Sequence, residues 1–430
     1  MFRTLFILTI VSIGTYYALQ SSFYALLLYM WNAYFRPEDW VWTDLISNLH
    51  ISYIAGCYVV LATLFSGKRL PMNGRIGLMM LFLIHTLLST LLSEHFEYCW
   101  LYWVDFLKTI IITYLMIILI DDFSKFRLVL LVVALSLGLE ASKQGWFYLL
   151  TSPGGANSNP IAFLGDNNGV AVGMLMLVPI IALLAQTTPR RWARLFYWLM
   201  LVGVLYRALS TYSRGGFLAC IAMGSTYCLY SQKKLRMLFA STIIVAIVLP
   251  TLPDTFWNRM TTIQTYQEAE DTSALGRFHF WQVAREMAAA HPFLGVGYHG
   301  YNLSYDDYDS SQGKYGHLRA AHNSPLAVVA ELGYLGLAIY MIIILSSLEA
   351  CHRVRKLAAT DPSLLDFSQS ATALITSLLV FLVGGFFVTF QYQEMLWHFF
   401  GLTIVLTELA NQHSSRPLKT YLSKAALAGC

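Results

Sequence analysis

The chain has 430 residues, of which 57% are hydrophobic and only 12% are charged. The charged share is about half that of an average soluble protein, which excludes a disordered chain, a nucleic-acid binder and an ordinary cytosolic enzyme. The net charge of +4 is too small to indicate a polyanionic partner. The six cysteines are scattered and include no C-x-x-C pair, so neither a disulfide framework nor a structural zinc site is expected. The composition predicts an all-α polytopic integral membrane protein.

Apolar runs of about 17 to 25 residues predict the membrane spans. The stretch 4–35 comes first, and the runs that follow are 50–66, 76–92, 101–119, 127–147, 169–186, 192–209, 214–231, 236–250, 323–348, 370–390 and 396–412. With one crossing plus a short re-entrant or interfacial piece in 4–35, the chain has about twelve transmembrane helices.

Basic residues occupy every second break between these runs, from Lys68 and Arg69 to the tail after residue 412. Under the positive-inside rule these breaks are cytoplasmic. A cytoplasmic Arg3 then predicts that both termini are cytoplasmic. The alternative is two crossings in 4–35, which places the N-terminus outside.

The chain divides into three predicted parts. Residues 1–250 carry transmembrane helices 1 to 9, and residues 323–430 carry helices 10 to 12 and a cytoplasmic tail. Between them, residues 251–322 have low hydrophobicity and fall on the outer side. Loops of this length in compact proteins are usually functional, so this loop is expected to contain helices and catalytic elements.

An arginine opens one span from the outer face, in the sequence Thr211-Tyr212-Ser213-Arg214-Gly215-Gly216. A helix N-terminus with an arginine is suited to bind an anion, and glycines let the backbone approach a ligand closely. The alternative is that Arg214 reaches toward lipid headgroups. The small, hydroxyl-rich setting, with Ser213 as a supporting residue, favours an anionic ligand.

The outer loop supplies further candidates. The segment that begins Gly276-Arg277-Phe278 predicts an amphipathic helix with Arg277 near its start and Arg285 further along. After it, the segment His291–Tyr298 contains Pro292 and two glycines and predicts a fixed turn.

The loop ends at Ala321-His322-Asn323, where the chain re-enters the membrane. A neutral His322 can take a proton from a hydroxyl near pH 7, and the alternative is that it caps the following helix. Asn323 is a supporting candidate beside it. Glu331 lies nine residues deeper than His322, and is expected to be hydrogen-bonded or to line a cavity.

Other charged groups receive structural interpretations. Asp105 with Lys108 and Glu140 with Lys143 are spaced to pair on their helices. The run Asp307-Tyr308-Asp309 matches the D-x-D that binds metal in some glycosyltransferases, but it lies in what looks like an exposed acidic loop. No metal site is therefore predicted.

Four motifs in order resemble the O-antigen ligase family: TYSRGGFLA, GRFHFWQVA, HPFLGVGYHGY and AHNSPLAVVAELGYLGLAIY. The resemblance covers roughly residues 160–345 and is most like the lipopolysaccharide O-antigen ligase. The first third of the chain has some similarity to the exosortase-associated glycosylation ligases, which keeps the acceptor open.

The resemblance implies an inner-membrane glycosyltransferase whose active site faces the periplasm. Such an enzyme moves a glycan from undecaprenyl diphosphate to a hydroxyl of lipid A–core, with inversion and without a metal or cofactor. The family's arginines map onto Arg214 and Arg277, as binders of the donor diphosphate, and its catalytic histidine onto His322. Membrane lipids surround the spans, and no nucleic acid is involved.

These roles also follow from the chemistry. A glycosyl diphosphate has a good leaving group, and two arginines can stabilise the charge that develops on it. A histidine can activate the acceptor hydroxyl. The span alternation, which makes no use of the family, places all three residues outside. The alternatives are an O-antigen polymerase, an O-linked protein glycosylation ligase and, in another class, a transporter; the sequence shows no internal repeat of the kind many transporters have.

Overall fold

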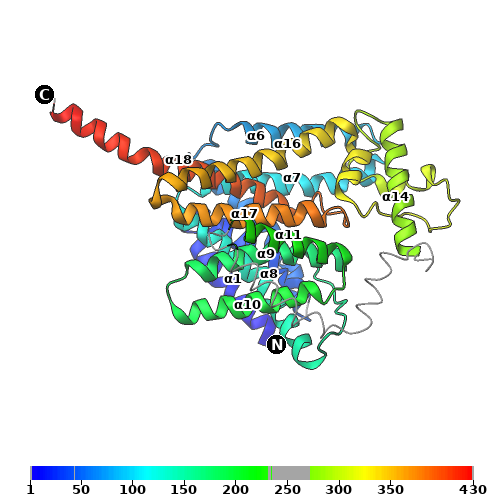
Figure 1. The fold of residues 1–430 in the computed structure, drawn as a ribbon, viewed down its shortest axis with the longest axis horizontal. Helices are drawn as coiled ribbons and strands as arrows, with labels where there is room; N and C mark the ends of the chain where they lie inside the picture. The colour runs from blue at the N-terminus through cyan, green and yellow to red at the C-terminus, as the bar shows by residue number, and fades with distance from the viewer. Residues whose placement is uncertain (1, 43, 231–233, 235–271, 429–430) are drawn as a thin grey trace.

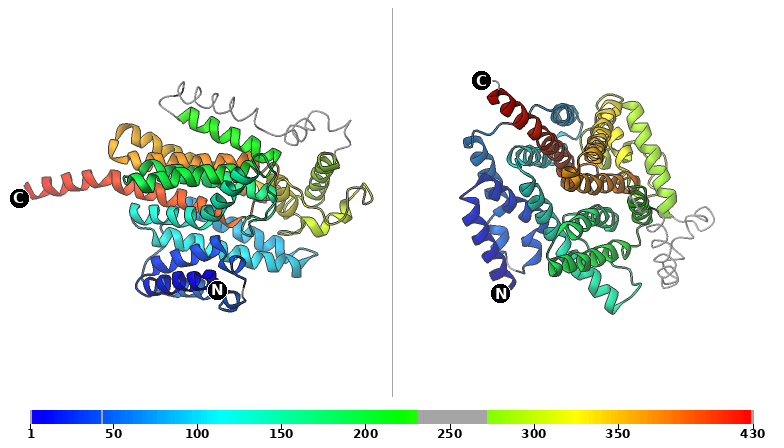
Figure 2. Two further views of the ribbon diagram at one scale, coloured as in Figure 1. Left: turned by 90° about the horizontal axis from the view of Figure 1, so that it is seen from below. Right: turned by 60° about the vertical axis from the view of Figure 1, so that its left-hand side comes forward.

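A computed structural model of the chain describes residues 2–42, 44–230, 234 and 272–428. The described part is helical and contains no strand beyond one isolated bridge between Ile161 and Gly165, which confirms the all-α prediction. The long helices run side by side, α14 lies across one end of them, and α18 projects from the other end (Figures 1 and 2).

The helices of the bundle match the predicted spans closely. They are α1 (Phe2–Ala18), α2 (Ser22–Phe35), α5 (Ile51–Phe65), α6 (Gly74–Leu91), α7 (Phe96–Leu119), α8 (Phe123–Thr151), α9 (Asn167–Thr187), α10 (Arg191–Leu209), α11 (Arg214–Tyr230), α16 (Ser324–Thr360), α17 (Leu365–Gly384) and α18 (Glu394–Ala428). The shorter elements are α3 (Pro37–Trp40), α4 (Leu45–Asn48), α14 (Thr272–Ala290), α15 (Tyr301–Ser304), η2 (Asp306–Tyr308) and η3 (Pro362–Leu364). The predicted span 236–250 and loop residues 251–271 lie outside the described residues.

Seven of the described helices are both long enough and apolar enough to cross a bilayer. They are α5 together with α4, then α6, α7, α9, α10, α16, and α17 together with η3. The count of about twelve stays a prediction.

Helix α9 forms the centre of the bundle. Nearly all of its apolar stretch is buried, because α8, α10, α11 and α17 pack around it. Asp166 begins the helix, and its side chain accepts a hydrogen bond from the backbone N–H of Gly169 at 2.8 Å. The start of the central helix therefore carries a carboxylate.

The two ends of the bundle differ in chemistry, and α6 connects them. At its start, Asn73 donates to Glu408 at 2.7 Å. Near its other end, Ser89 donates to the carbonyl of Leu294 in the loop at 2.7 Å. The predicted cytoplasmic breaks gather at the Asn73 end, where Lys68 and Lys125 both pair with Asp121. The alternation of basic breaks thus corresponds to a real separation of the two ends.

The start of the chain lies at the loop end, not at the basic end. Arg3 donates to the backbone oxygen of Trp40 at 3.2 Å and lies over the rings of Trp40 and Trp42. The residues around Trp40 are at the loop end, because neighbouring Arg36 lines a cavity together with Ala320. Within 4–35 the chain forms two packed helices, α1 and α2. The orientation of the two termini stays a prediction. The contacts of Arg3 with two tryptophan rings favour the alternative that places the N-terminus on the loop side.

Helix α16 is interrupted where the outer loop packs against it. Gly333 has a left-handed φ of 69° inside the 37-residue helix, and the backbone N–H of Tyr334 donates to the carbonyl of Pro292 at 2.8 Å. Val296 donates to the carbonyl of Ala330 at 2.9 Å, so the predicted turn satisfies groups that the break leaves unpaired. A Cβ on Gly295 would lie 2.2 Å from the carbonyl carbon of Glu331. The glycines in HPFLGVGYHGY and ELGYLG therefore allow these two motifs to pack backbone against backbone.

Candidate active site

Ser213 and Arg214 stand at the start of α11, beside the start of the central helix. Ser213 is buried, donates to Asn168 Oδ1 at 2.8 Å and accepts from the N–H of Gly216 at 3.1 Å. A Cβ on Gly215 would meet the Phe387 side chain at 2.4 Å, and one on Gly216 would meet Ala171 at 2.7 Å. We expected these glycines to let a ligand approach the backbone, and this is corrected: the side chains of Phe387 and Ala171 occupy that space. Their packing fixes Arg214 at the loop end of the bundle.

The residue after His322 caps α16. Asn323 accepts from the N–H of Leu326 at 3.0 Å through its side-chain oxygen and donates to the carbonyl of Phe386 at 3.2 Å. His322 has a φ of 46° and is half-buried. The alternative role of His322 as the cap is therefore excluded, because Asn323 fills it.

A short segment after α17 joins the starts of α11 and α16. Ser324 donates its N–H to Gly385 at 2.6 Å and its hydroxyl to Val388 at 2.7 Å, while Phe387 packs on Gly215. Residues 385–388 thus hold the helix that begins at Arg214 and the helix that follows His322 at the same end of the molecule.

Arg277 comes to this end on α14. The indole N–H of Trp281 donates to the carbonyl of Ala321 at 3.1 Å, and the ring of Phe280 lies 6.5 Å from the ring of His322. Burial lowers the pKa of His322 below its usual value, the charges of Arg277 and Arg319 lower it further, and Asp166 acts in the opposite direction. His322 is therefore neutral near pH 7 and able to accept a proton.

Arg285 lies further along α14, about two turns after Arg277. It is exposed and lines an open groove of about 620 Å³ together with Phe278, Trp281 and Leu326. The structure does not place it among the groups that act on the pKa of His322.

Glu331 is hydrogen-bonded and also lines a cavity, the two settings expected for it. It is buried, and its carboxylate accepts from the hydroxyl of Tyr392 at 2.8 Å and from the amide of Gln391 at 3.4 Å. It also lines a cavity of about 650 Å³ that extends to Ala320 and Asp166. The break at Gly333 lies directly beyond it, so Glu331 stands where the helix backbone is irregular.

The D-x-D run separates into two different carboxylates. Asp307 is exposed, whereas Asp309 accepts hydrogen bonds from His279 at 2.6 Å, from the N–H and hydroxyl of Ser311, and from the N–H of Gly313. Burial would raise the pKa of the Asp309 carboxyl, but these hydrogen bonds hold it well below its usual range. The expectation of an exposed acidic loop is wrong for Asp309, which organises the loop. Among the described residues, no cluster of three or more metal-ligating groups is found.

Residues 199–341 match the family model described as O-antigen ligase. The chain carries an O-antigen ligase domain. Residues 2–189 match a second model, described as a family of unknown function (DUF5935). No curated protein matches the chain. The resemblance seen in the four motifs is thereby confirmed.

The O-antigen ligase domain contains Arg214, Arg277, His322 and Glu331. It runs across both predicted domain boundaries, at 250 and at 322, because it joins α10 and α11 to the loop and α16. The match to this domain supports a ligase or polymerase type of function in general. Together with the apolar helices, it indicates a multi-pass membrane protein. The acidic residue Asp166 belongs to the other matched region.

Several residues of this region were not found from the sequence. Asp166 and the segment 385–388 carry no recognisable motif. They lie near His322 only because the starts of α9, α11 and α16 pack together. Arg207 is fully buried in α10 and donates to Gln144 at 3.0 Å and to the backbone of Asn157 and Asn159. Arg207 thereby holds the segment that leads to Asp166. A lone arginine within an apolar run could have indicated this role from the sequence.

Proposed function

We propose that the protein is a glycosyltransferase that moves a glycan from undecaprenyl diphosphate to a hydroxyl of lipid A–core on the periplasmic side of the bacterial inner membrane. The observation that carries this proposal is the setting of His322. It is a half-buried histidine next to a helix start, and the charge of Arg277 lowers its pKa while the charge of Asp166 raises it. The O-antigen ligase match over residues 199–341 supports the reaction type.

In the proposed reaction, His322 takes the proton of the acceptor hydroxyl. The acceptor oxygen forms a bond to the anomeric carbon as the bond from that carbon to the diphosphate oxygen breaks. The diphosphate leaves with the electron pair, and Arg214 and Arg277 stabilise its charge through forked, charge-assisted hydrogen bonds. Attack opposite the leaving group inverts the anomeric centre.

The two arginines supply the positive charge that a metal provides in other glycosyltransferases. The engagement of Asp309 with His279, Ser311 and Gly313 supports this view, since that carboxylate already has its hydrogen-bond partners. The orientation follows from the separation of the basic end from the site and from the positive-inside rule.

The test uses purified full-length protein, undecaprenyl diphosphate-linked glycan and lipid A–core. Glycan-capped lipid A–core should form without added metal, and the His322→Ala protein should form little of it. Extension of the carrier-linked glycan instead would establish a polymerase, and transfer to a serine- or threonine-containing protein would establish a protein ligase. Movement of carrier lipid across vesicles without transfer would establish a transporter and overturn the proposal.

A further inference from the structure

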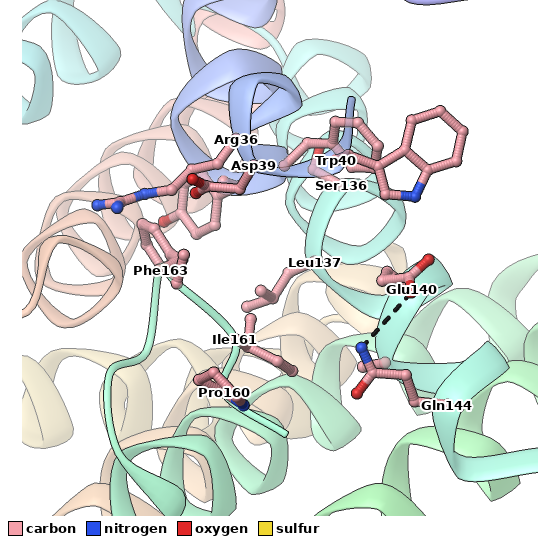
Figure 3. Close-up of a pocket in the computed structure, with 14 residues that line it drawn as sticks. Arg36, Asp39, Trp40, Ser136, Leu137, Glu140, Gln144, Pro160, Ile161 and Phe163 are labelled. Carbon is pink, nitrogen blue, oxygen red and sulfur yellow. Dashed lines mark hydrogen bonds between the residues drawn. The ribbon is translucent and has the colours of Figure 1, made fainter. Parts of the chain in front are cut away.

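One cavity is lined by both matched regions of the chain and by residues 389–394, which belong to neither region. Its volume is about 650 Å³. Arg36, Tyr102, Asp105 and Asp166 come from the region of unknown function, and His299 and Glu331 from the O-antigen ligase domain. A smaller cavity of about 170 Å³ adjoins it and shares Arg36 and Phe163 with it (Figure 3). The region of unknown function therefore lines a cavity that also reaches Ala320, two residues before His322.

The wall of this cavity is mainly acidic. It contains four carboxylates, Asp105, Asp166, Glu331 and Glu394, and one guanidinium, Arg36. Lys108 lies next to the wall and pairs with Asp105 at 2.8 Å. Carboxyl groups therefore outnumber cations in this wall, and an anionic ligand would find little positive charge to pair with here.

A second feature indicates what the cavity binds. Gln391 lines the cavity and is 3% exposed, yet its side-chain Oε1 has no hydrogen-bond partner among the described residues. A buried acceptor atom without a partner costs free energy, so a ligand that donates hydrogen bonds would be stabilised at this point. Hydroxyl groups of a sugar donate such bonds.

Aromatic rings form part of the same wall. Tyr102 stacks on His299 with ring centroids 4.1 Å apart, and Tyr298 lies 4.3 Å from Tyr392. Rings beside carboxylate and amide acceptors suit a ligand with apolar C–H faces and polar edges, which is the chemistry of a sugar ring.

The donor diphosphate requires the opposite environment. Arg277, proposed to bind it, lowers the pKa of His322 together with Arg319. Asp166, on the cavity wall, raises that pKa. Ala320 lines the cavity two residues before His322. The cavity therefore comes close to His322, whose pKa responds both to the cations Arg277 and Arg319 and to the wall residue Asp166.

We propose that this cavity binds the acceptor, and that its acidic wall selects an uncharged or amino sugar over a phosphorylated one. The proposal rests on the proposed function, because it assigns the acceptor side of the same reaction. It gives the region of unknown function a role in choosing the acceptor.

The test compares two forms of lipid A–core, with and without phosphate on the outer sugars, as acceptors for the full-length enzyme. Wild type should use the phosphate-free form with a kcat/KM about tenfold higher or more, in line with the steep cost of placing like charges together. Thr389 is an exposed residue of the wall, and Thr389→Lys should reduce that ratio several-fold. Its neutral, size-matched control Thr389→Gln should keep the wild-type ratio, and both variants should keep the wild-type KM for the donor.

Equal use of both acceptors by wild type would overturn the proposal. So would a Thr389→Lys protein whose change appears in the KM for the donor, since the cavity would then belong to the carrier side. If wild type transfers to no form of lipid A–core, the proposed function fails, and the cavity is tested separately with methyl glucoside and glucose 6-phosphate. Stronger quenching of tryptophan fluorescence by methyl glucoside would still support the selectivity of the wall, whereas equal or stronger quenching by the phosphate would reject it.

Discussion

Trp281 donates its indole N–H to the carbonyl of Ala321 at 3.1 Å, which ties the helix of Arg277 to the residue before His322. The tie fixes a cation and a neutral imidazole in one small region of the loop. Because the charge of Arg277 lowers the pKa of His322, the two groups proposed to act on donor and acceptor are also coupled electrostatically.

The pH dependence of transfer should reflect this coupling. Burial and Arg277 lower the pKa of His322 below 6.5, so the base is neutral throughout the neutral range. Activity should fall only as the pH drops through that lowered pKa. Trp281→Phe loosens α14, so it should shift the acid limb upward toward 6.5 and lower kcat several-fold. An acid limb that is unchanged in Trp281→Phe would show that the tie is only structural.

His322 and Asn323 provide a matched pair of variants. His322→Ala should lower turnover about 10²- to 10⁴-fold with little change in melting temperature. Asn323→Ala removes the helix cap and should cost about 1 kcal/mol of stability, while turnover per folded molecule falls much less. Melting temperature, donor binding and turnover are measured on the same preparations. The base assignment is wrong if His322→Ala turns over within a few-fold of wild type.

The two arginines should not tolerate lysine. Arg214→Lys and Arg277→Lys keep the charge but lose the forked geometry that matches a phosphate, and each should lower kcat/KM for the carrier-linked donor by at least about tenfold. Arg285→Lys is the control, because Arg285 is exposed in the open groove, and it should change this kcat/KM little. Near-normal transfer by both lysine variants would mean that neither guanidinium contacts the diphosphate.

The two carboxylates Asp307 and Asp309 of the acidic loop should differ in importance: the first should be dispensable and the second structural. Asp307→Ala should be mild, because Asp307 is exposed. Asp309→Ala leaves His279, Ser311 and Gly313 without their acceptor and should lower the melting temperature clearly. Transfer by wild type should persist in EDTA. Activity that is lost with chelator and regained with magnesium would instead restore the metal interpretation of Asp307 and Asp309.

The position of the N-terminus can be tested by cysteine labelling in a background without native cysteines. A cysteine at Thr4, next to Arg3, should react with an impermeant reagent from the same side as one at exposed Ser310 in the loop. A cysteine at Ser66, at the basic end, should react only after the membrane is permeabilised. Labelling of Thr4→Cys together with Ser66→Cys would restore the cytoplasmic N-terminus.

The sequence predicted the features that depend on local pattern. Apolar run lengths gave the positions of the helices, and the amphipathic segment after Gly276 is α14. Arg214 and His322 were recognisable because each is a polar residue at the edge of an apolar run. The contributions of Asp166 and residues 385–388 arise only from packing between distant segments. The contacts of Arg3 were not predictable for the same reason, since its aromatic partners lie far along the chain.

The break in α16 has a consequence for how the protein is made. The turn that pairs with Ala330 and Tyr334 emerges from the ribosome before those residues do. During synthesis, the N–H and carbonyl groups of this turn therefore stay hydrogen-bonded to water until α16 has entered the membrane. A nascent chain stalled before Ser324 would leave this loop without its backbone partners, and membrane insertion of α16 becomes the step that completes the loop end of the bundle.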